Sequence, residues 1–172
     1  MKACVFIATS LDGFIARKDG SFDFLPDEPE EHGFTAFYAS VQALLVGRKT
    51  YETMLSFGGW HYGKKPVFVL SSRPIPTPPA GAVVEHLQGE PKDIAAHIDA
   101  RGIERVYLDG GTTIQRFLEA GMVDRMTITR VPVLIGSGIP LFGPTTRDIR
   151  LRHINTQFYP SGLVTSEYEV LR

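Results

Sequence analysis

The sequence lacks the features on which several classes of protein depend. Its single cysteine, Cys4, excludes an internal disulfide and a cluster of thiolate zinc ligands. Its 18 basic residues are balanced by 19 acidic ones, without the basic excess that nucleic-acid-binding proteins use to neutralise phosphates. No apolar segment approaches the roughly 18 residues of a membrane span. We therefore expect neither a nucleic-acid nor a membrane partner.

Metal-site spacing and a secretory leader are missing as well. The five histidines do not show the i, i+4 spacing of a helical zinc pair, so we expect no metal. The N-terminal apolar run gives way to Thr9, Ser10 and Asp12 before it reaches the length of a signal-peptide core. A first β-strand explains this run better, and we expect a cytoplasmic protein.

The pattern of apolar residues predicts one α/β domain over residues 1–172. The length and the 43% hydrophobic content suit a single domain with a sizeable core. Segments rich in Val, Ile, Leu and aromatic residues predict strands at 2–8, 43–47, 66–70, 105–109 and 123–133. Helical patterns alternate with them, which implies crossover connections and a mixed, mostly parallel central sheet with flanking helices. Residues 149–171 predict a C-terminal antiparallel hairpin turning at "YPSG".

The segment 112–121 is the clearest helix. Thr112 and Gln115 predict a capping box at its start, because their spacing lets each side chain bond a backbone N–H of the other. Gly121 follows the last apolar residue, where a glycine commonly ends a helix.

Three predicted strands end in the same kind of polar segment, at residues 47–50, 71–73 and 110–113. Ligands of open α/β sheets bind beyond the carboxyl ends of strands, where helix N-termini offer free N–H groups and glycines let the backbone approach a phosphate. Arg48 and Lys49 at a helix start oppose the helix dipole, by up to about 1 kcal/mol, and a bound anion would remove that penalty. Each segment alone is also typical of a turn or a solvated loop. Together they predict a dinucleotide site.

These segments resemble the dihydrofolate reductase superfamily, which includes the reductase domain of riboflavin biosynthesis. The resemblance is carried by "LLVGRKTYETM", "VFVLSSRP" and "VYLDGGTTIQRFL", in this order. "SLDGFIA" and "VPVLIGSGIPLFG" are more similar to the riboflavin-type branch, so that the likeness covers nearly the whole chain. It implies a dihydrofolate reductase-like three-layer fold, NADPH as cofactor and a homodimer. An apolar strand at 131–135 near a sheet edge would favour such pairing.

The resemblance also implies where NADPH would bind. Residues 71–73 match positions around the adenosine 2′-phosphate, and residues 110–113 match the glycine loop against the pyrophosphate. A 2′-phosphate requires a guanidinium and hydroxyl donors, which NADH would leave unpaired. The implied cofactor residues are Ala8, Ile15, Ala16, Gly47, Arg48, Lys49, Thr50, Leu70, Ser71, Ser72, Arg73, Gly110, Gly111, Thr112 and Thr113. The first three of them match the wall against the nicotinamide.

The substrate side is less well defined. Folate enzymes place a carboxylate on the first helix; counting back from Gly47 gives Glu31, whereas alignment on "LP" gives Glu28. We prefer Glu31, because Thr129 then matches the hydroxyl that supports this carboxylate in the family. The acids at 27–31 could instead be a favourable first helical turn. Asp12 is a further substrate-side candidate, although a turn aspartate explains it equally.

The expected function is therefore that of an NADPH-dependent reductase of a small heteroaromatic or pyrimidine-type substrate. The family suggests 5-amino-6-(5-phosphoribosylamino)uracil reductase activity. Dihydrofolate reductase activity is the alternative within the class, weakened because "FDFLP" lacks the tryptophan of the family's W-x-L-P motif. The alternative from another class is a non-catalytic NADPH-binding module. The proton donor is left open between Glu31, a water or both.

Overall fold

The computed structural model describes residues 1–27 and 32–172. Its strands are β1 (Lys2–Ser10), β2 (Phe14–Ala16), β3 (Ala43–Gly47), β4 (Val67–Leu70), β5 (Val84–Leu87), β6 (Arg105–Asp109), β7 (Arg125–Val131), β8 (Ile139–Pro140), β9 (Leu151–Phe158) and β10 (Val164–Val170). Its helices are α1 (Phe34–Ser40), α2 (Arg48–Ser56), α3 (Pro91–Asp99) and α4 (Gly111–Glu119). The predicted alternation of strands and helices is confirmed.

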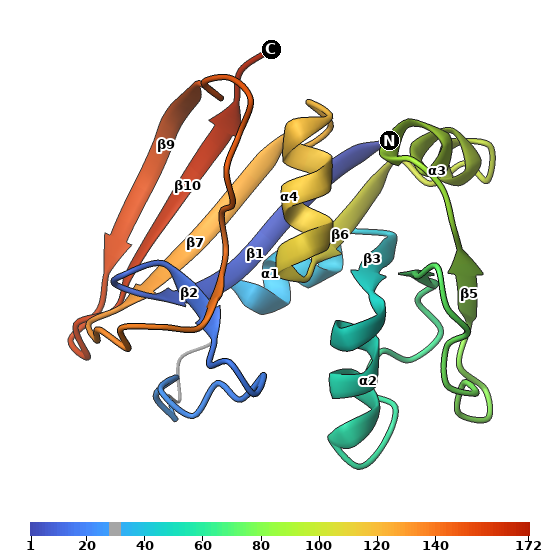
Figure 1. Ribbon diagram of the computed structural model, residues 1–172, viewed down its shortest axis with the longest axis horizontal. Helices are drawn as coiled ribbons and strands as arrows, with labels where there is room; N and C mark the ends of the chain where they lie inside the picture. Colours follow the sequence, from blue (N-terminus) through green and yellow to red (C-terminus); the bar gives the residue numbers. More distant parts are fainter. Residues whose placement is uncertain (28–31) are drawn as a thin grey trace.

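Eight of the strands form one sheet in the order β5-β4-β3-β6-β1-β7-β10-β9 (Figure 1). The pairs from β5 to β7 are all parallel, and only β10 pairs antiparallel, with β7 and with β9. Short strands β2 and β8 form a separate antiparallel pair. The mixed, mostly parallel sheet with a C-terminal hairpin is therefore as predicted. The parallel strands all end at the same edge of the sheet.

Helices cover both faces of this sheet and so produce three layers (Figure 1). On one face, α3 and α4 pack the buried side chains of Ile98 and Phe117 against Leu45 and its neighbours. On the other face, Tyr51 of α2 is fully buried in a second apolar cluster. Burying one such side chain stabilises the fold by about 1.5–3 kcal/mol. The strand ends between the two layers are thus held rigidly.

The ends of α4 confirm one prediction and correct another. Gly121 has φ 67° and donates its N–H to the Leu118 carbonyl at 2.9 Å, the expected glycine stop. The capping box is wrong, because no side chain caps α4 and Gly110 occupies the N-cap position. Gln115 instead donates from Nε2 to the carbonyls of Pro140 and Leu141, at 3.1 and 3.2 Å. A tertiary contact has taken the side chain that the local motif would have used.

Strands β2, β5 and β8 were not predicted, because each is short and none shows clear alternation of apolar and polar residues. The expected edge strand at 131–135 is also wrong. Strand β7 ends at Val131 and lies between β1 and β10, inside the sheet. At this end of the sheet the edge strand is β9, the first strand of the C-terminal hairpin, in which every residue is exposed.

Candidate cofactor-binding and active site

The N-termini of α2 and α4 lie side by side at the carboxyl edge of the sheet. The two helices follow β3 and β6, which are parallel neighbours. A Cβ at Gly47 would lie 2.8 Å from the Thr113 hydroxyl oxygen, and a Cβ at Gly110 would lie 2.6 Å from the Thr50 hydroxyl oxygen. Each loop therefore presses a threonine against the glycine of the other loop. Only residues without a side chain fit at these two points.

Neither helix N-terminus has a side-chain cap. The backbone N–H groups of the first turns are therefore left without the partners that usually satisfy them. Two adjacent N-termini, each carrying the positive end of a helix dipole, form a site for an anion with two charged groups, such as a diphosphate. Arg48 adds a cation here, and its guanidinium also pairs with Glu52 one turn further along α2.

Gly111 is required by the packing of the protein itself. A Cβ at this position would lie 3.1 Å from both Ile15 Cδ1 and the Pro140 carbonyl oxygen. These atoms belong to β2 and β8, so the small two-stranded sheet rests directly on the start of α4. Ile15, which the resemblance places at the nicotinamide wall, is thereby next to the glycine pair.

A cavity of about 490 Å³ opens beside α2, at the ends of β4 and β5. Its lining includes Arg48, Leu70, Ser71, Ser72 and Arg73, so the structure brings together the cations and hydroxyls that were expected around a 2′-phosphate. The Ser71 hydroxyl is held by the backbone of residue 73, from which it accepts at 2.9 Å and to which it donates at 2.7 Å.

Two further observations change the predicted set of residues at this cavity. Arg116 of α4 also lines the cavity, with Nη2 donating to the Gly89 carbonyl at 2.9 Å and lying 3.7 Å from Glu90 Oε1. Helical spacing alone gave no signal for it, because the contact depends on how α4 crosses the sheet. Lys49 and Thr112 have exposed side chains outside this lining.

Strands β1 and β6 separate as they approach the same edge. Their ladder ends at Cys4 opposite Tyr107, whereas β1 stays paired with β7 as far as Ser10. Beyond the last pair, the Tyr107 hydroxyl donates to the Phe6 carbonyl at 2.9 Å. The separation places Ala8, another residue implied at the nicotinamide wall, on a part of β1 that is no longer paired with β6.

Asp109 is a candidate active-site residue that the sequence reasoning missed. It is the last residue of β6, directly before the glycine pair, and its Oδ1 accepts a hydrogen bond from the Gly110 N–H at 2.8 Å. Burial raises the pKa of this carboxyl to about 6, although the Gly110 hydrogen bond opposes the shift. The carboxyl is therefore about half protonated near pH 6, well above the range of an ordinary aspartate. The signal in the sequence that could have identified Asp109 was an acidic residue between an apolar strand and two glycines.

The substrate-side candidates are only partly visible. Glu31 and Glu28 lie outside the described residues. Thr129 is buried and shares a hydrogen bond of 2.8 Å with the Thr165 hydroxyl. Helix α1 begins at Phe34, so Asp27 is not in its first turn, and the acids at 28–31 lie outside the described residues.

Asp12 has a clear structural contact. Its carboxylate accepts hydrogen bonds from the N–H groups of Gly136 at 2.8 Å and Ile135 at 3.3 Å. A hydrogen bond from Ser10 is the main cause that lowers the pKa of Asp12. The side chain thus ties the end of β1 to the loop after β7, and its role toward a substrate stays a prediction.

The geometry defines an α/β fold of the dihydrofolate reductase type, in which two helix N-termini without side-chain caps meet at one edge of the sheet. The model of the RibD C-terminal domain family matches residues 2–165. The chain belongs to this family. A solved putative riboflavin biosynthesis protein from Shewanella sp. PV-4 is similar over 100% of both chains, with a TM-score of 0.92 and 39% identity.

Other similar proteins include an uncharacterized bacterial protein and two dihydrofolate reductases. Protein YwjB of Bacillus subtilis is 32% identical over 156 residues, which is 88% of each chain. Dihydrofolate reductase HdrB of Haloferax volcanii is 27% identical over 123 residues, covering 69% of this chain and 62% of that protein. The Enterococcus faecalis dihydrofolate reductase complexed with NADP(H) shares the fold, with a TM-score of 0.66 at 15% identity over 99% of this chain and 97% of that one.

Two kinds of feature are absent from residues 1–27 and 32–172. No helix in this part of the chain is long and apolar enough to cross a membrane. Within the same residues, no group of three or more His, Cys, Asp and Glu side chains could hold a metal ion.

The interlocked glycines predict a specific loss of stability. Gly110 has φ 98° and no room for a Cβ, whereas Gly20 has φ 89° with nothing within 4 Å of a Cβ. Gly20→Ala should therefore lower the free energy of unfolding by about 1 kcal/mol, from backbone strain alone. Gly110→Ala should lower it by about 2–4 kcal/mol, because overpacking adds to the strain. Urea unfolding measures both, and equal losses would contradict the interlocked arrangement.

Asp109 predicts a pH-dependent stability. Its pKa is raised from 3.8 to about 6, so the folded state favours the protonated carboxyl, and this contribution is lost as the pH rises through that interval. Asp109→Asn is neutral throughout. Its advantage over the wild type should grow between about pH 4 and pH 6 to about 2 kcal/mol and stay constant above. Urea unfolding across this range tests the shift, and a pH-independent difference would show that the carboxyl is not perturbed.

Proposed function

We propose that the protein is an NADPH-dependent reductase of a small heteroaromatic or pyrimidine-type substrate. The observation that carries this proposal is the convergence of two uncapped helix N-termini next to a cavity with arginines and serines. Membership of the RibD C-terminal domain family supports it, because relatives in both branches of the superfamily are named as reductases.

The residues at this edge fit NADPH. The diphosphate would accept hydrogen bonds from the first turns of α2 and α4, where no side chain competes. The 2′-phosphate would lie in the cavity of about 490 Å³, against Arg48, Arg73 and the two serines between β4 and Arg73. The nicotinamide would lie toward Ala8 and Ile15. When bound there, NADPH supplies a hydride to the substrate.

The chain itself must supply orientation and a proton. Asp109 can hold this proton, because burial raises its pKa to about 6. Asp109 directly precedes the glycine pair. It therefore lies at the end of β6, next to the N-terminus of α4 that would bind the diphosphate. The Asp109 carboxyl would therefore donate the proton at the edge where β1 and β6 separate.

Two substrates deserve a direct comparison. We favour 5-amino-6-(5-phosphoribosylamino)uracil, since the matching family model is that of the RibD C-terminal domain. Dihydrofolate is the second candidate, because HdrB of Haloferax volcanii shares 27% identity. The loss of NADPH absorbance with each compound tests the proposal. Turnover of the pyrimidine above that of dihydrofolate is expected, whereas NADPH binding without turnover of either would favour a non-catalytic binding module.

A homodimer is also proposed, on the resemblance and not on an apolar strand at 131–135. The surface that would be available is β9, an edge strand with all residues exposed, including Phe158 at 84% exposure. Exposed strand edges readily pair with another chain. Light scattering should give about twice the 19.0 kDa of one chain, and a monomer at micromolar concentration would remove this proposal.

The cavity predicts preference for NADPH over NADH. Arg48→Ala should weaken NADPH binding by about 1–3 kcal/mol, the range for a lost charge-assisted hydrogen bond, and should affect NADH much less. Lys2→Ala is the matched control, because Lys2 is an exposed cation at the start of β1 and does not line the cavity. Calorimetric titration with both cofactors measures the difference. Equal wild-type affinities for NADPH and NADH, or equal effects of the two substitutions, would contradict the 2′-phosphate assignment.

A further inference from the structure

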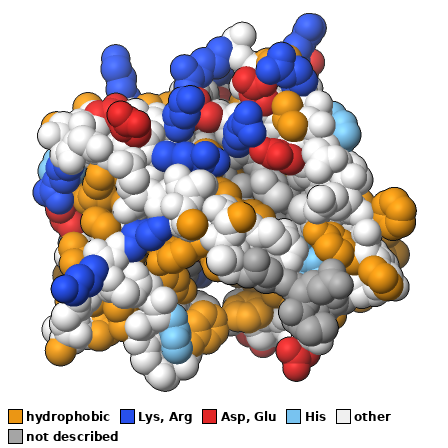
Figure 2. Space-filling view, turned by 180° about the vertical axis from the view of Figure 1, so that it is seen from behind, with side chains coloured by type: hydrophobic (Ala, Val, Ile, Leu, Met, Phe, Trp, Pro, Cys, Tyr) orange, Lys and Arg blue, Asp and Glu red, His pale blue; other side chains and the backbone are white. Residues whose placement is uncertain are grey.

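A second cavity, of about 230 Å³, lies on the sheet face that carries α1. Strands β1, β6, β7, β9 and β10 contribute to its lining, together with one side of α1. It lies along residues 4–6 of β1, and its last lining residue on that strand, Phe6, is about 7 Å from Ala8 at the rise of a β-strand. None of the residues proposed to hold NADPH lines it. Figure 2 shows the molecule from behind, with Lys and Arg side chains gathered along its upper part.

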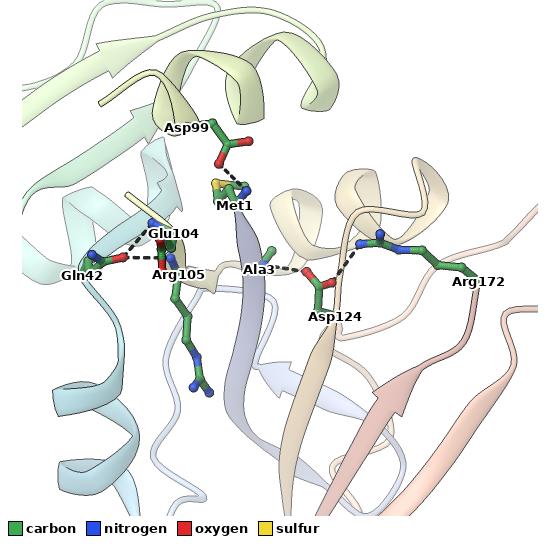
Figure 3. A network of polar contacts seen from close by, with 8 residues as sticks. All are labelled: Met1, Ala3, Gln42, Asp99, Glu104, Arg105, Asp124 and Arg172. Atoms are coloured by element: carbon green, nitrogen blue, oxygen red, sulfur yellow. Dashed lines mark hydrogen bonds and ion pairs between the residues drawn. The ribbon is translucent and has the colours of Figure 1, made fainter. Parts of the chain in front are cut away.

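Arg105 provides a cation with spare hydrogen-bonding capacity at this cavity. Its backbone N–H is held by Gln42 Oε1 at 3.0 Å, but its guanidinium points away from Gln42 and Glu104 (Figure 3). Among the described residues, the guanidinium donates only to Cys4 Sγ, from Nε at 3.3 Å. Its remaining N–H groups can therefore form a fork for a carboxylate.

The other charges that the described part of the chain contributes to the lining leave one positive charge in excess. Arg125 is paired, with Nη1 donating to Glu167 Oε1 at 2.7 Å. Among the described lining residues, two arginines and one glutamate give a net charge of +1. Burial raises the pKa of the Cys4 thiol, and Arg105 and Arg125 both lower it, in agreement with two cations near this sulfur. A ligand with a single negative charge would balance the cavity.

The remaining walls combine an aromatic side with a polar one. Phe6 and Phe37 lie with ring centroids 5.0 Å apart, and both line the cavity. Facing strands contribute the amides of Asn155 and Gln157 and the Thr165 hydroxyl. Aromatic rings favour a planar apolar group, and the amides can bond polar atoms at its edge.

We propose that this cavity binds a small aromatic monocarboxylate, whose carboxylate pairs with Arg105 and whose ring lies against Phe6 and Phe37. The volume is below the roughly 300–1,000 Å³ of pockets for drug-sized ligands, which suits a molecule of one ring. A phosphate monoester would bring close to two negative charges against an excess of one. This cavity shares no residue with the proposed cofactor site, although its Thr165 shares a hydrogen bond with Thr129 of the predicted substrate side.

Benzoate is the probe, titrated calorimetrically into the full chain at mildly alkaline pH. Benzoate should bind saturably, and benzamide, its neutral isostere, should bind at least about tenfold more weakly. Arg105→Gln should weaken benzoate by a similar factor. Arg152→Gln is the matched control, because Arg152 pairs with Glu169 on the same hairpin and does not line the cavity. This variant should bind benzoate as the wild type does.

Thermal melting of each variant checks that it folds. Should Arg105→Gln fail to fold, Arg105→Lys decides, because it keeps the positive charge but not the guanidinium fork, with an expected loss of several-fold in benzoate affinity. Absence of saturable benzoate binding, equal binding of benzamide, or unchanged binding in folded Arg105→Gln would each overturn the proposal. Phenyl phosphate binding more tightly than benzoate would overturn the assignment to a monocarboxylate.

Discussion

The site depends on the contact between two loops, in which Gly47 faces Thr113 and Gly110 faces Thr50. With virtual Cβ distances of 2.8 and 2.6 Å, neither glycine can carry a side chain while the loops keep this spacing. The contact holds the N-termini of α2 and α4 together over adjacent strand ends. Because neither helix is capped by a side chain, two sets of backbone N–H groups converge on one place. The rest of the site is arranged around this pair of helix ends.

At the same edge, one buried carboxyl lowers the stability of the folded protein and is also the proposed proton donor. A carboxyl whose pKa is raised to about 6 by burial destabilises the folded protein at neutral pH, and Asp109 has no cation among the causes of its shift. Its position beside the glycine pair, where β1 has left β6, gives this cost a functional explanation. Residues that break a local rule without compensation are expected at functional sites. The proposed proton donor is such a residue.

The strand ends could be read from the sequence, since apolar runs followed by Gly47, Ser71 and Gly110 mark buried strands entering turns or helices. The assembly of Arg48 with the segment after β4 followed from the rule that parallel strands end together. Contacts between distant segments could not be read: Gln115 bonds the 140–141 carbonyls instead of capping its helix, and Arg116 reaches the cavity only through the crossing of α4. The raised pKa of Asp109 likewise depends on burial, which no local pattern reports.

A crystal structure of the full chain with NADPH tests the central claim most directly. We expect the diphosphate between the first turns of α2 and α4, against the backbone N–H groups there, and the 2′-phosphate in contact with Arg48 or Arg73. The nicotinamide ring should lie toward Ala8, within reach of the Asp109 carboxyl. A diphosphate bound away from these two helix ends, or NADPH seated in the cavity beside Arg105, would contradict the account.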